Sequence, residues 1–233
     1  MYYTTLLFDL DHTLLDADKA ETVSFDVTLR AAGVDDPSRY VSRYAEINDA
    51  LWAAVERNEI TPDDVRVTRF ARLAAAANIE ADPQTMADDY VAGMVTNAEL
   101  YPDARAVLET LSTQATLAVV TNGIGDVQRP RVKQLGIARY FEAVVISGDV
   151  GTAKPGAAIY NIVFEQLGWP DKKKTLMIGD SLSSDIPGGI SYGIATCWYN
   201  PDHKPSPPDV AIDHVIRSLT QLPALARDGS IAP

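Results

Sequence analysis

Short apolar runs recur along the chain, separated by segments with helical periodicity. Runs rich in strand formers lie at 5–8, 117–120, 143–146, 176–178 and 194–199, with a weaker sixth at 215–216. Tyr101-Pro102-Asp103 opens one helical pattern with proline in the first turn, and two others cover 126–135 and 155–167 and stop at glycines. Strand and helix alternating in this way predict an α/β fold, a doubly wound parallel sheet with helices on both faces.

The connection after the first strand departs from this alternation, because residues 16–97 carry only helical signals. Thr61 and Pro62 supply a cap and a first-turn proline for one of these helices. The apolar stripes in the segment are Tyr40, Tyr44, Ile47, Leu51 and Val55, then Phe70, Leu73, Ala74 and Ala77, then Met86, Tyr90 and Met94. A segment of about 80 residues is too long for a loop. We expect an α/β core domain of 1–15 and 98–233, with 16–97 forming a small all-helical cap over the end of the first strand.

Composition narrows the class of protein. The 233 residues, 46% of them hydrophobic, suffice for one sizeable core and an accessory domain. A formal net charge of −12 argues against a nucleic-acid polymer or an anionic membrane as partner. No apolar stretch approaches a membrane span of roughly 18 residues, and Asp9 interrupts any secretory signal, so we expect a cytoplasmic protein. Cys197 is the only cysteine, which excludes an internal disulfide.

Two carboxylates, Asp9 and Asp11, follow the first apolar run directly. Parallel sheets place their ligands at the carboxyl ends of their strands, and alternate residues of an extended chain share a side. Asp9 and Asp11 can therefore aim at one point while Leu10 faces into the packing. Two converging acids indicate a metal ion or a shared proton.

Polar side chains also follow three later strands. Thr121, Asn122 and Gly123 end the second strand, where a hydroxyl and free backbone amides suit a phosphoryl oxygen. The alternative is a plain strand-to-helix turn. Lys154 precedes Pro155 after the third strand, although a lone loop lysine usually faces solvent.

Two acids follow the fourth strand. Asp180 stands directly after Gly179, so we weight a metal role above helix capping for it. Asp185 lies in the ensuing turn, where a metal role and helix capping are equally open.

Four motifs therefore follow four strands in order: D-x-D-x-T at Asp9, T-N-G at Thr121, G-x-x-K-P at Gly151 and G-D-x-x-x-x-D at Gly179. This set resembles the haloacid dehalogenase-like hydrolase superfamily over the whole chain, and the helical insert resembles that superfamily's small cap. A third glycine of a dinucleotide fingerprint would fall at Gln128, so that interpretation fails.

The resemblance implies a role for each matching residue. It makes Asp9 the nucleophile that forms an aspartyl-phosphate, and Asp11 the general acid and base. Thr121, Asn122 and Lys154 would bind phosphate, Thr121 and Lys154 also serving the reaction. The Asp9 carboxylate, the Asp11 backbone carbonyl and Asp180 would hold Mg²⁺, with Asp185 bound directly or through water.

Electrostatics fit this assignment. A phosphate dianion about 4 Å from a carboxylate is repelled by roughly 8 kcal/mol at an effective dielectric of 20, whereas Mg²⁺ would attract it by roughly 16 and Lys154 by roughly 8 before desolvation. Asp11 must carry a proton to the leaving oxygen, and we expect neighbouring anions to raise its pKa above the ordinary value near 3.9. Asp11 also argues against the dehalogenases of the superfamily, which lack an acid there.

The cap sequence around Glu46-Ile47-Asn48, Trp52, Ile60-Thr61 and Arg69-Phe70 resembles the pyrimidine 5′-nucleotidase branch, which hydrolyses nucleoside monophosphates. Asn48 falls within this likeness; Trp52 would stack on a base and Arg69 would hydrogen-bond one. The alternatives are cap core for Trp52 and a surface salt bridge for Arg69. His12 is a further candidate for substrate contact under the lid.

Other functions remain open on the sequence. A phosphatase for phosphoglycolate or a sugar phosphate, or a phosphomutase, shares the same motifs. A catalytically silent binding protein is disfavoured, because the catalytic carboxylates and the lysine are all present. The partner in each enzymatic case is a small phosphorylated metabolite.

Overall fold

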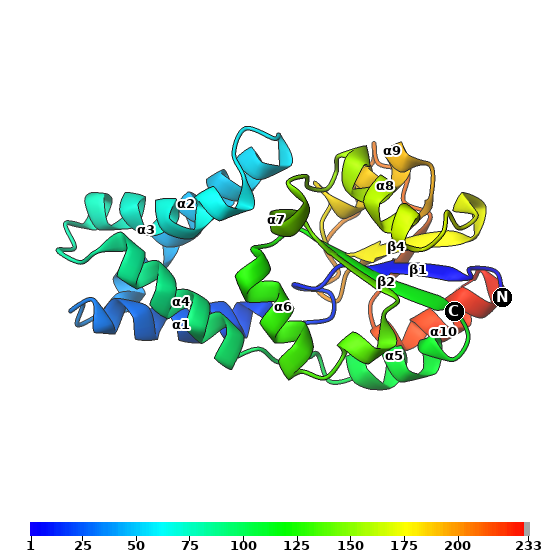
Figure 1. Cartoon of the computed structure of the whole chain (residues 1–233), viewed down its shortest axis with the longest axis horizontal. Helices are drawn as coiled ribbons and strands as arrows, with labels where there is room; N and C mark the ends of the chain where they lie inside the picture. Colours follow the sequence, from blue (N-terminus) through cyan, green and yellow to red (C-terminus); the bar gives the residue numbers. More distant parts are fainter. Residues whose placement is uncertain (231–233) are drawn as a thin grey trace.

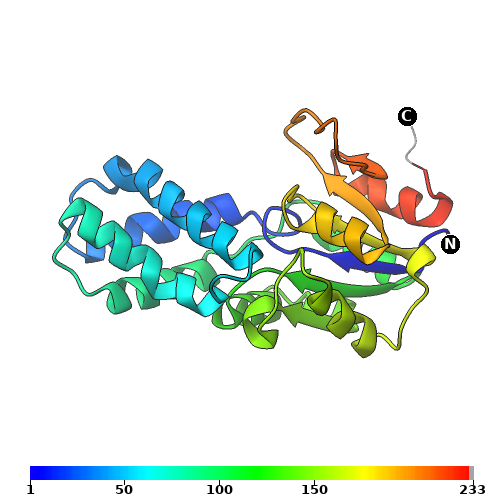
Figure 2. The same ribbon diagram turned by 90° about the horizontal axis from the view of Figure 1, so that it is seen from above.

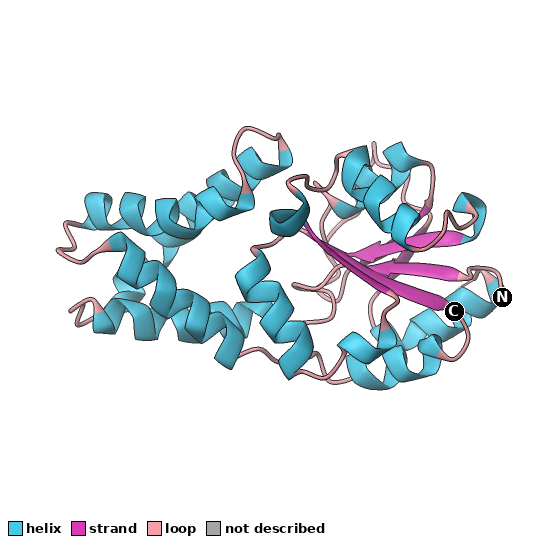
Figure 3. Ribbon diagram, viewed as in Figure 1, coloured by secondary structure: helices cyan, strands magenta, loops and turns pink. Residues whose placement is uncertain are grey.

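A six-stranded parallel sheet flanked by helices forms the core of one half of the molecule, on the right in Figure 3. The computed structural model describes residues 1–230. The strands are β1 (Thr5–Phe8), β2 (Thr116–Thr121), β3 (Ala143–Ile146), β4 (Thr175–Gly179), β5 (Ala195–Tyr199) and β6 (His214–Ile216). Their spatial order is β3-β2-β1-β4-β5-β6, and each neighbouring pair is parallel. The expected doubly wound sheet is confirmed, including its weak sixth strand.

The strand order reverses between β1 and β4, and this switch point determines where a ligand can bind. Phe8 of β1 lies level with Val119 of β2 and Ile178 of β4. The N–H of Asp9 continues the ladder by donating to the Ile178 carbonyl at 2.9 Å. Sheets of this kind bind ligands in the crevice at the carboxyl ends of the two strands flanking the reversal. Asp9 and Asp180 are the first residues beyond those two strands.

Helices of the core cover both faces of the sheet, as the buried side chains require. Leu6 and Phe8 pack on one face and Leu7 on the other, all three without solvent exposure. Burying each such side chain contributes about 1.5–3 kcal/mol. The core helices are α5 (Ala104–Ser112), α6 (Gly125–Gln134), α7 (Ser147–Val150), α8 (Ala157–Gln166), α9 (Asp185–Tyr192) and α10 (Leu222–Asp228), with 3₁₀ turns η2 (Ala138–Tyr140), η3 (Lys172–Lys174) and η4 (Leu219–Gln221).

A helical unit follows β1 and lies to one side of the sheet (Figures 1 and 2). It consists of α1 (Ala17–Ala31), η1 (Pro37–Tyr40), α2 (Val41–Glu56), α3 (Pro62–Ala77) and α4 (Pro83–Thr96). The expected stripes are buried, except that Tyr40 and Ala77 are half-buried. Thr61 forms a reciprocal capping box with Asp64, which confirms the expected helix start. We propose that this unit is the cap domain, 16–97, on a core of 1–15 and 98–233.

The helical unit packs against the loops at the carboxyl ends of the strands. Ile124, Val127 and Ala153 of the core belong to the same buried cluster as the cap helices. Polar contacts between the cap and the core include Arg66 with Asp126 at 3.2 Å, the Ser183 hydroxyl donating to Glu56 at 3.1 Å, and Lys19 with Glu99 at 2.6 Å. The cap therefore lies over the end of the sheet where the candidate residues gather.

The third predicted core helix begins later than expected, at Ala157 instead of Pro155. The Asn122 amide accepts from the Lys154 N–H at 2.8 Å and donates to the Lys154 carbonyl at 2.9 Å, which holds the preceding segment out of the helix. Among the helices of residues 1–230, none combines the length and the apolar character that crossing a bilayer requires.

Candidate active site

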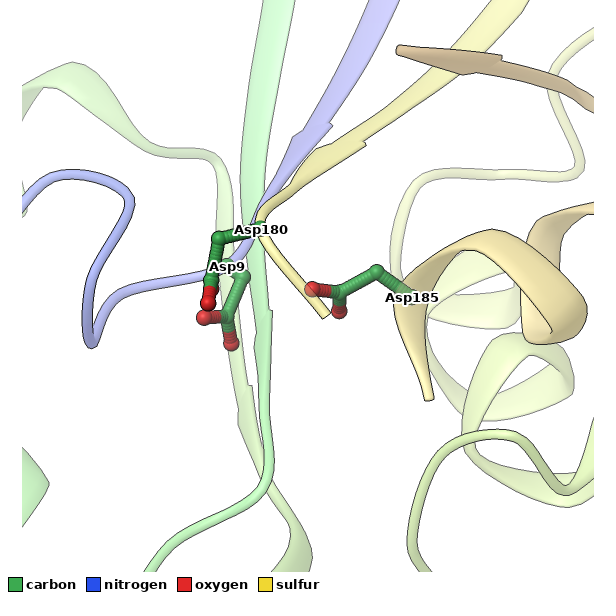
Figure 4. A group of neighbouring side chains, drawn as sticks. All are labelled: Asp9, Asp180 and Asp185. Carbon is green, nitrogen blue, oxygen red and sulfur yellow. The ribbon is translucent and has the colours of Figure 1, made fainter. Parts of the chain in front are cut away.

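Three carboxylates meet beyond the ends of β1 and β4 (Figure 4). Asp9 follows β1, Asp180 follows β4 and Asp185 opens α9, and their nearest oxygens lie within 4.8 Å of one another. Asp9 and Asp185 are buried and Asp180 is half-buried. The Thr13 hydroxyl donates to Asp180 at 3.2 Å, so the threonine of the first motif orients the acid of the fourth.

Lys154 joins two of these carboxylates instead of facing solvent. Its Nζ lies 2.6 Å from Oδ1 of Asp9 and 2.6 Å from Oδ1 of Asp185. The side chain is 1% exposed, so these two carboxylates balance its charge in place of water. Asn122, predicted to bind phosphate, uses its side-chain amide to fix the Lys154 backbone.

This group contains three carboxylates and one ammonium, so it carries excess negative charge in a buried place. Burial is the main cause that raises the pKa of Asp9 and of Asp180 to about 6, and each is raised further by a neighbouring carboxylate. Burial also raises the pKa of Asp185. Burial alone would lower the pKa of Lys154, but the charges of Asp185 and Asp9 outweigh it and raise that pKa.

The Asp185 carboxylate points toward Asp9 and Asp180 and does not cap a helix. Its Oδ2 accepts from the Ser181 N–H at 3.0 Å, while Ser184 occupies the cap position of α9. Gly179 is required beside it, because any Cβ there would collide with the Asp185 carboxylate. The capping alternative for Asp185 is therefore wrong.

Polar groups of the T-N-G turn that were expected to be free for phosphate already contact other protein groups. Thr121 is fully buried, and the Gln128 amide approaches its hydroxyl at 3.5 Å. The Gly123 N–H, expected to be a free donor for phosphate, donates to the Ser147 hydroxyl at 2.9 Å. That expectation is wrong because α7 follows β3 closely and brings Ser147 against the turn.

Asp11 is held by two side chains of α6. Its Oδ1 accepts from Arg131 Nη1 at 2.7 Å, and its Oδ2 accepts from Gln128 Nε2 at 2.6 Å. Burial alone would raise the pKa of Asp11, but Arg131, His12 and Gln128 outweigh it and lower that pKa. The expected upward shift is wrong, because a buried guanidinium faces this carboxylate where only anions were foreseen.

A cavity of about 690 Å³ lies between the cap and these residues. Its size falls within the range of small-molecule sites. Acidic side chains outnumber basic ones in its lining, so an anionic ligand there needs added positive charge. The lining includes most of the expected site: Asp9, Asp11, His12, Asn48, Trp52, Arg69, Asn122, Lys154 and Asp180. Thr121 and Asp185 lie behind this lining.

Arg69 and its neighbours form the cap wall of the cavity. Arg69 is 4% exposed and lies over the Tyr90 ring at 4.4 Å, with its Nη1 3.4 Å from Asn48 Oδ1. The surface salt-bridge alternative for Arg69 is therefore wrong. Arg69 Nε and the hydroxyls of Tyr44 and Tyr90 are buried and lack a hydrogen-bond partner within residues 1–230. Trp52 both lines the cavity and packs against the cap cluster.

His12 lines the cavity and has a left-handed backbone conformation with φ of 58°. Burial alone would lower its pKa, but Asp11, Asp180 and Asp18 outweigh it and raise that pKa. Its Nδ1 lies 3.6 Å from Asp18. A raised pKa favours the imidazolium, which adds positive charge to the lining of the cavity.

Two site residues, Gln128 and Arg131, were not foreseen. Their spacing of three places both on one helical face, beside the T-N-G turn. A polar pair at that spacing among buried neighbours is a signal that the sequence does contain. Glu21 and Glu56 also line the cavity, and nothing in their sequence context distinguishes them from surface acids.

The donor set fits a hard divalent cation. Mg²⁺ prefers oxygen ligands and is commonly held by one or two carboxylates together with phosphate oxygens. Asp9, Asp180 and Asp185 offer three carboxylates against the single charge of Lys154. The excess negative charge and the oxygen donors both match such an ion.

The model of the haloacid dehalogenase-like hydrolase family matches residues 6–199. Pyrimidine 5′-nucleotidase PynA of Streptococcus pneumoniae is 41% identical over 204 residues, which cover 87% of this chain and 86% of the relative. Pyrimidine 5′-nucleotidase YjjG of Escherichia coli is 32% identical over 230 residues, covering 97% of this chain and 98% of the relative.

A solved structure resembles the whole molecule. The HAD-hydrolase YfnB of Bacillus subtilis, described as bound to magnesium and as revealing interdomain movement, superposes with a TM-score of 0.87. It is 34% identical and covers 97% of this chain and 99% of its own. The resemblance therefore extends over the sheet and the helical unit together.

Proposed function

The chain belongs to the haloacid dehalogenase-like hydrolases, in the branch similar to pyrimidine 5′-nucleotidases, and from this premise we propose that it is a Mg²⁺-dependent phosphomonoesterase for nucleoside 5′-monophosphates. The observation that carries the proposal is the cluster of Asp9, Asp180 and Asp185 with Lys154 bound between two of them. The structural neighbour described with magnesium supports the choice of metal.

The proposed reaction has two steps on Asp9. An Asp9 oxygen attacks phosphorus in line and the bond to the ester oxygen breaks, leaving an aspartyl-phosphate. Asp11 supplies a proton to the departing oxygen and then takes one from the water that hydrolyses the intermediate. The lowered pKa of Asp11 keeps it ionised before substrate binds. A phosphate dianion bound beside it raises its affinity for a proton, so Asp11 takes up from solvent, as substrate binds, the proton that it then supplies.

The remaining core residues prepare this reaction. Lys154 holds the Asp9 carboxylate in place and balances charge on the phosphoryl oxygens, while the Asn122 side chain fixes the lysine loop. Asp9, the Asp11 carbonyl and Asp180 would hold Mg²⁺, with Asp185 behind them. The cation supplies electrostatic stabilisation of the anionic phosphoryl group when bound.

A panel of esters tests the function. We expect Mg²⁺-dependent phosphate release to be fastest with UMP, CMP or dTMP and slower with AMP, phosphoglycolate and glucose 6-phosphate. EDTA should abolish it with every ester. Equal or faster release from phosphoglycolate or the hexose phosphate would favour the other phosphatase classes over the nucleotidase.

Magnesium affinity should depend steeply on pH. The pKa values of Asp9 and Asp180 are about 6, above the unfolded value of 3.8, so the folded state binds these protons more tightly than the unfolded state does. The two groups therefore lower the stability of the fold as pH rises from about 3.8 to about 6. Mg²⁺ needs the ionised forms, so its apparent Kd should rise about tenfold per pH unit below 6 for each proton displaced.

Calorimetric titration at pH 5, 6 and 7.5 measures this dependence. Thermal melting supplies a second readout, since a metal at 100 times its Kd stabilises by about 2.7 kcal/mol. The stabilisation by 5 mM Mg²⁺ should therefore be larger at pH 7.5 than at pH 5. A Kd that is constant over this range would contradict the assignment of Asp9 and Asp180 as ligands.

Arg69 should determine selectivity at the base end of the substrate. Its buried donors and those of Asn48 suit the ring carbonyl oxygens of a pyrimidine. We expect Arg69→Met to raise KM for UMP about tenfold or more, because a lost hydrogen bond from a charged donor costs about 1.5–3 kcal/mol. Hydrolysis of p-nitrophenyl phosphate, which lacks a base, should change little.

The matched control is Arg72→Met, which alters an exposed arginine on the same helix. Steady-state kinetics with both esters compare the two variants. A similar loss with both esters in Arg69→Met would assign Arg69 to cap folding instead of base recognition.

A further inference from the structure

Both carboxylate oxygens of Asp11 accept hydrogen bonds from side chains on one face of α6. Arg131 Nη1 donates to Oδ1 at 2.7 Å and Gln128 Nε2 donates to Oδ2 at 2.6 Å. Arg131 Nη1 also donates to Gln128 Oε1 at 3.0 Å, which fixes the orientation of the Gln128 amide. The three side chains therefore form a closed ring of hydrogen bonds with one consistent donor pattern.

The burial of this arrangement is costly and calls for an explanation. Arg131 is 0% exposed and Gln128 is 1% exposed. Arg131 Nε and Nη2 have no hydrogen-bond partner within residues 1–230. A buried guanidinium with some of its N–H donors unpaired lowers the stability of the fold. Within the described part of the chain its one ion pair is with Asp11, so its contribution is to that carboxylate.

The same hydrogen bonds connect Asp11 to the T-N-G turn, which is the proposed phosphate-binding part of the site. Helix α6 starts two residues after Gly123, and Gln128 Nε2 lies 3.5 Å from the Thr121 hydroxyl. Gln128 thus touches the T-N-G strand end and the second acid of the first motif together. This contact sets the position of the Asp11 carboxylate relative to the strand that would bind phosphate.

We propose that Arg131 and Gln128 are positioning residues that hold the Asp11 carboxylate in line with the leaving oxygen for proton transfer. The inference rests on the proposed phosphatase function and goes beyond it, since it adds a second layer that acts through Asp11. A side chain with free rotation would present its proton in the wrong place for much of the time. General acid catalysis of this kind contributes about 10²–10⁴-fold.

Leaving-group dependence separates this role from a structural one. A nucleoside leaves as a poor alkoxide that needs a proton, whereas p-nitrophenolate departs without one. We expect Arg131→Met to lower kcat/KM for UMP about 100-fold while kcat/KM for p-nitrophenyl phosphate stays within about threefold. Asp11 also activates water in the second step, so kcat for the aryl ester should fall together with its KM.

Three further variants make the test specific. Arg129→Met changes an exposed arginine on the same helix and should leave both kcat/KM values unchanged. Arg131→Lys restores a charge near Asp11 and should recover part of the UMP activity. Gln128→Leu removes the second contact and should lower kcat/KM for UMP about tenfold, again sparing the aryl ester. If circular dichroism shows that Arg131→Met does not fold, Gln128→Leu provides the test instead.

The outcomes are distinct. A selective loss with UMP supports the inference. An equal loss with both esters in folded Arg131→Met and Gln128→Leu, or no loss with either, would overturn it. Failure of the wild-type protein to hydrolyse any ester with Mg²⁺ would instead reject the proposed function.

Discussion

We expect the Asp9→Asn variant to lose phosphate release, with kcat lower by at least about 10⁴-fold, because an amide cannot form the covalent intermediate. The fold should survive. Asp9 is 7% exposed and isosteric with asparagine, and Lys154 keeps its 2.6 Å contact with Asp185. Replacing one of several crowded carboxylates also removes repulsion, since neighbouring acids raise the pKa of Asp9.

Steady-state kinetics with UMP and thermal melting measure the two expectations together. Asp63→Asn is the matched control, since it makes the same change at an exposed aspartate in the first turn of α3. Mass spectrometry should confirm that the introduced amide has not deamidated back to aspartate. An Asp9→Asn protein that retains a tenth of wild-type turnover would exclude a covalent intermediate on Asp9, and the attacking group would have to lie elsewhere in the cavity.

The meeting of the strand-end carboxylates was predictable because it depends on short-range rules. Asp9 and Asp180 follow directly after buried parallel strands, and the register of β1 with β4 brings such positions together whatever the loops do. The fold class followed from the same alternation of strands and helices. Asp185 was ambiguous, because an acid in a turn can cap a helix or point inward, and its contacts with Lys154 and with the Ser181 N–H decide between the two.

The environment of Asp11 was not predictable from its own sequence context. Its partners Arg131 and Gln128 are more than 110 residues away in the chain, and their contact depends on how α6 is rotated against the sheet. Because of these contacts, the pKa of Asp11 is lowered where the sequence predicted that it would be raised. Likewise, the Gly123 N–H is occupied only because Ser147 arrives from the next strand. Such long-range contacts depend on how distant elements pack, and this packing cannot be inferred from the residues around each position.

Cap residues fall between these cases. The helical spacing predicted which positions of 16–97 are buried, and Tyr44, Phe70 and Tyr90 do pack together. Spacing alone did not reveal that buried Arg69 would be stacked on Tyr90 while it also lines the cavity. A polar residue on an apolar stripe is thus the useful signal, since its burial needs a partner or a ligand.

Lys154→Met should damage both catalysis and stability. The ammonium group lies 2.6 Å from Asp9 and 2.6 Å from Asp185 and is 1% exposed, so its removal leaves two buried carboxylates unpaired. Breaking a buried pair in this way costs about 3–5 kcal/mol. At about 2–4 °C per kcal/mol for a chain of this size, Tm should fall by about 6–20 °C. Loss of a charge that stabilises the phosphoryl group should lower kcat about 10³-fold.

The stability deficit of this variant should depend on pH with a defined sign. Lys154 lowers the pKa of Asp9 and of Asp185, so both rise further above the unfolded 3.8 when it is absent. Carboxyl groups with raised pKa values destabilise the fold when ionised, so the deficit should be large at pH 8 and smaller at pH 5.

Urea unfolding at the two pH values in EDTA measures the deficit, with the exposed Lys133→Met on α6 as control. A deficit equal at pH 5 and pH 8 would mean that lost packing, and not unpaired charge, destabilises the variant. In that case the lysine would not be the counter-charge on which a carboxylate nucleophile depends.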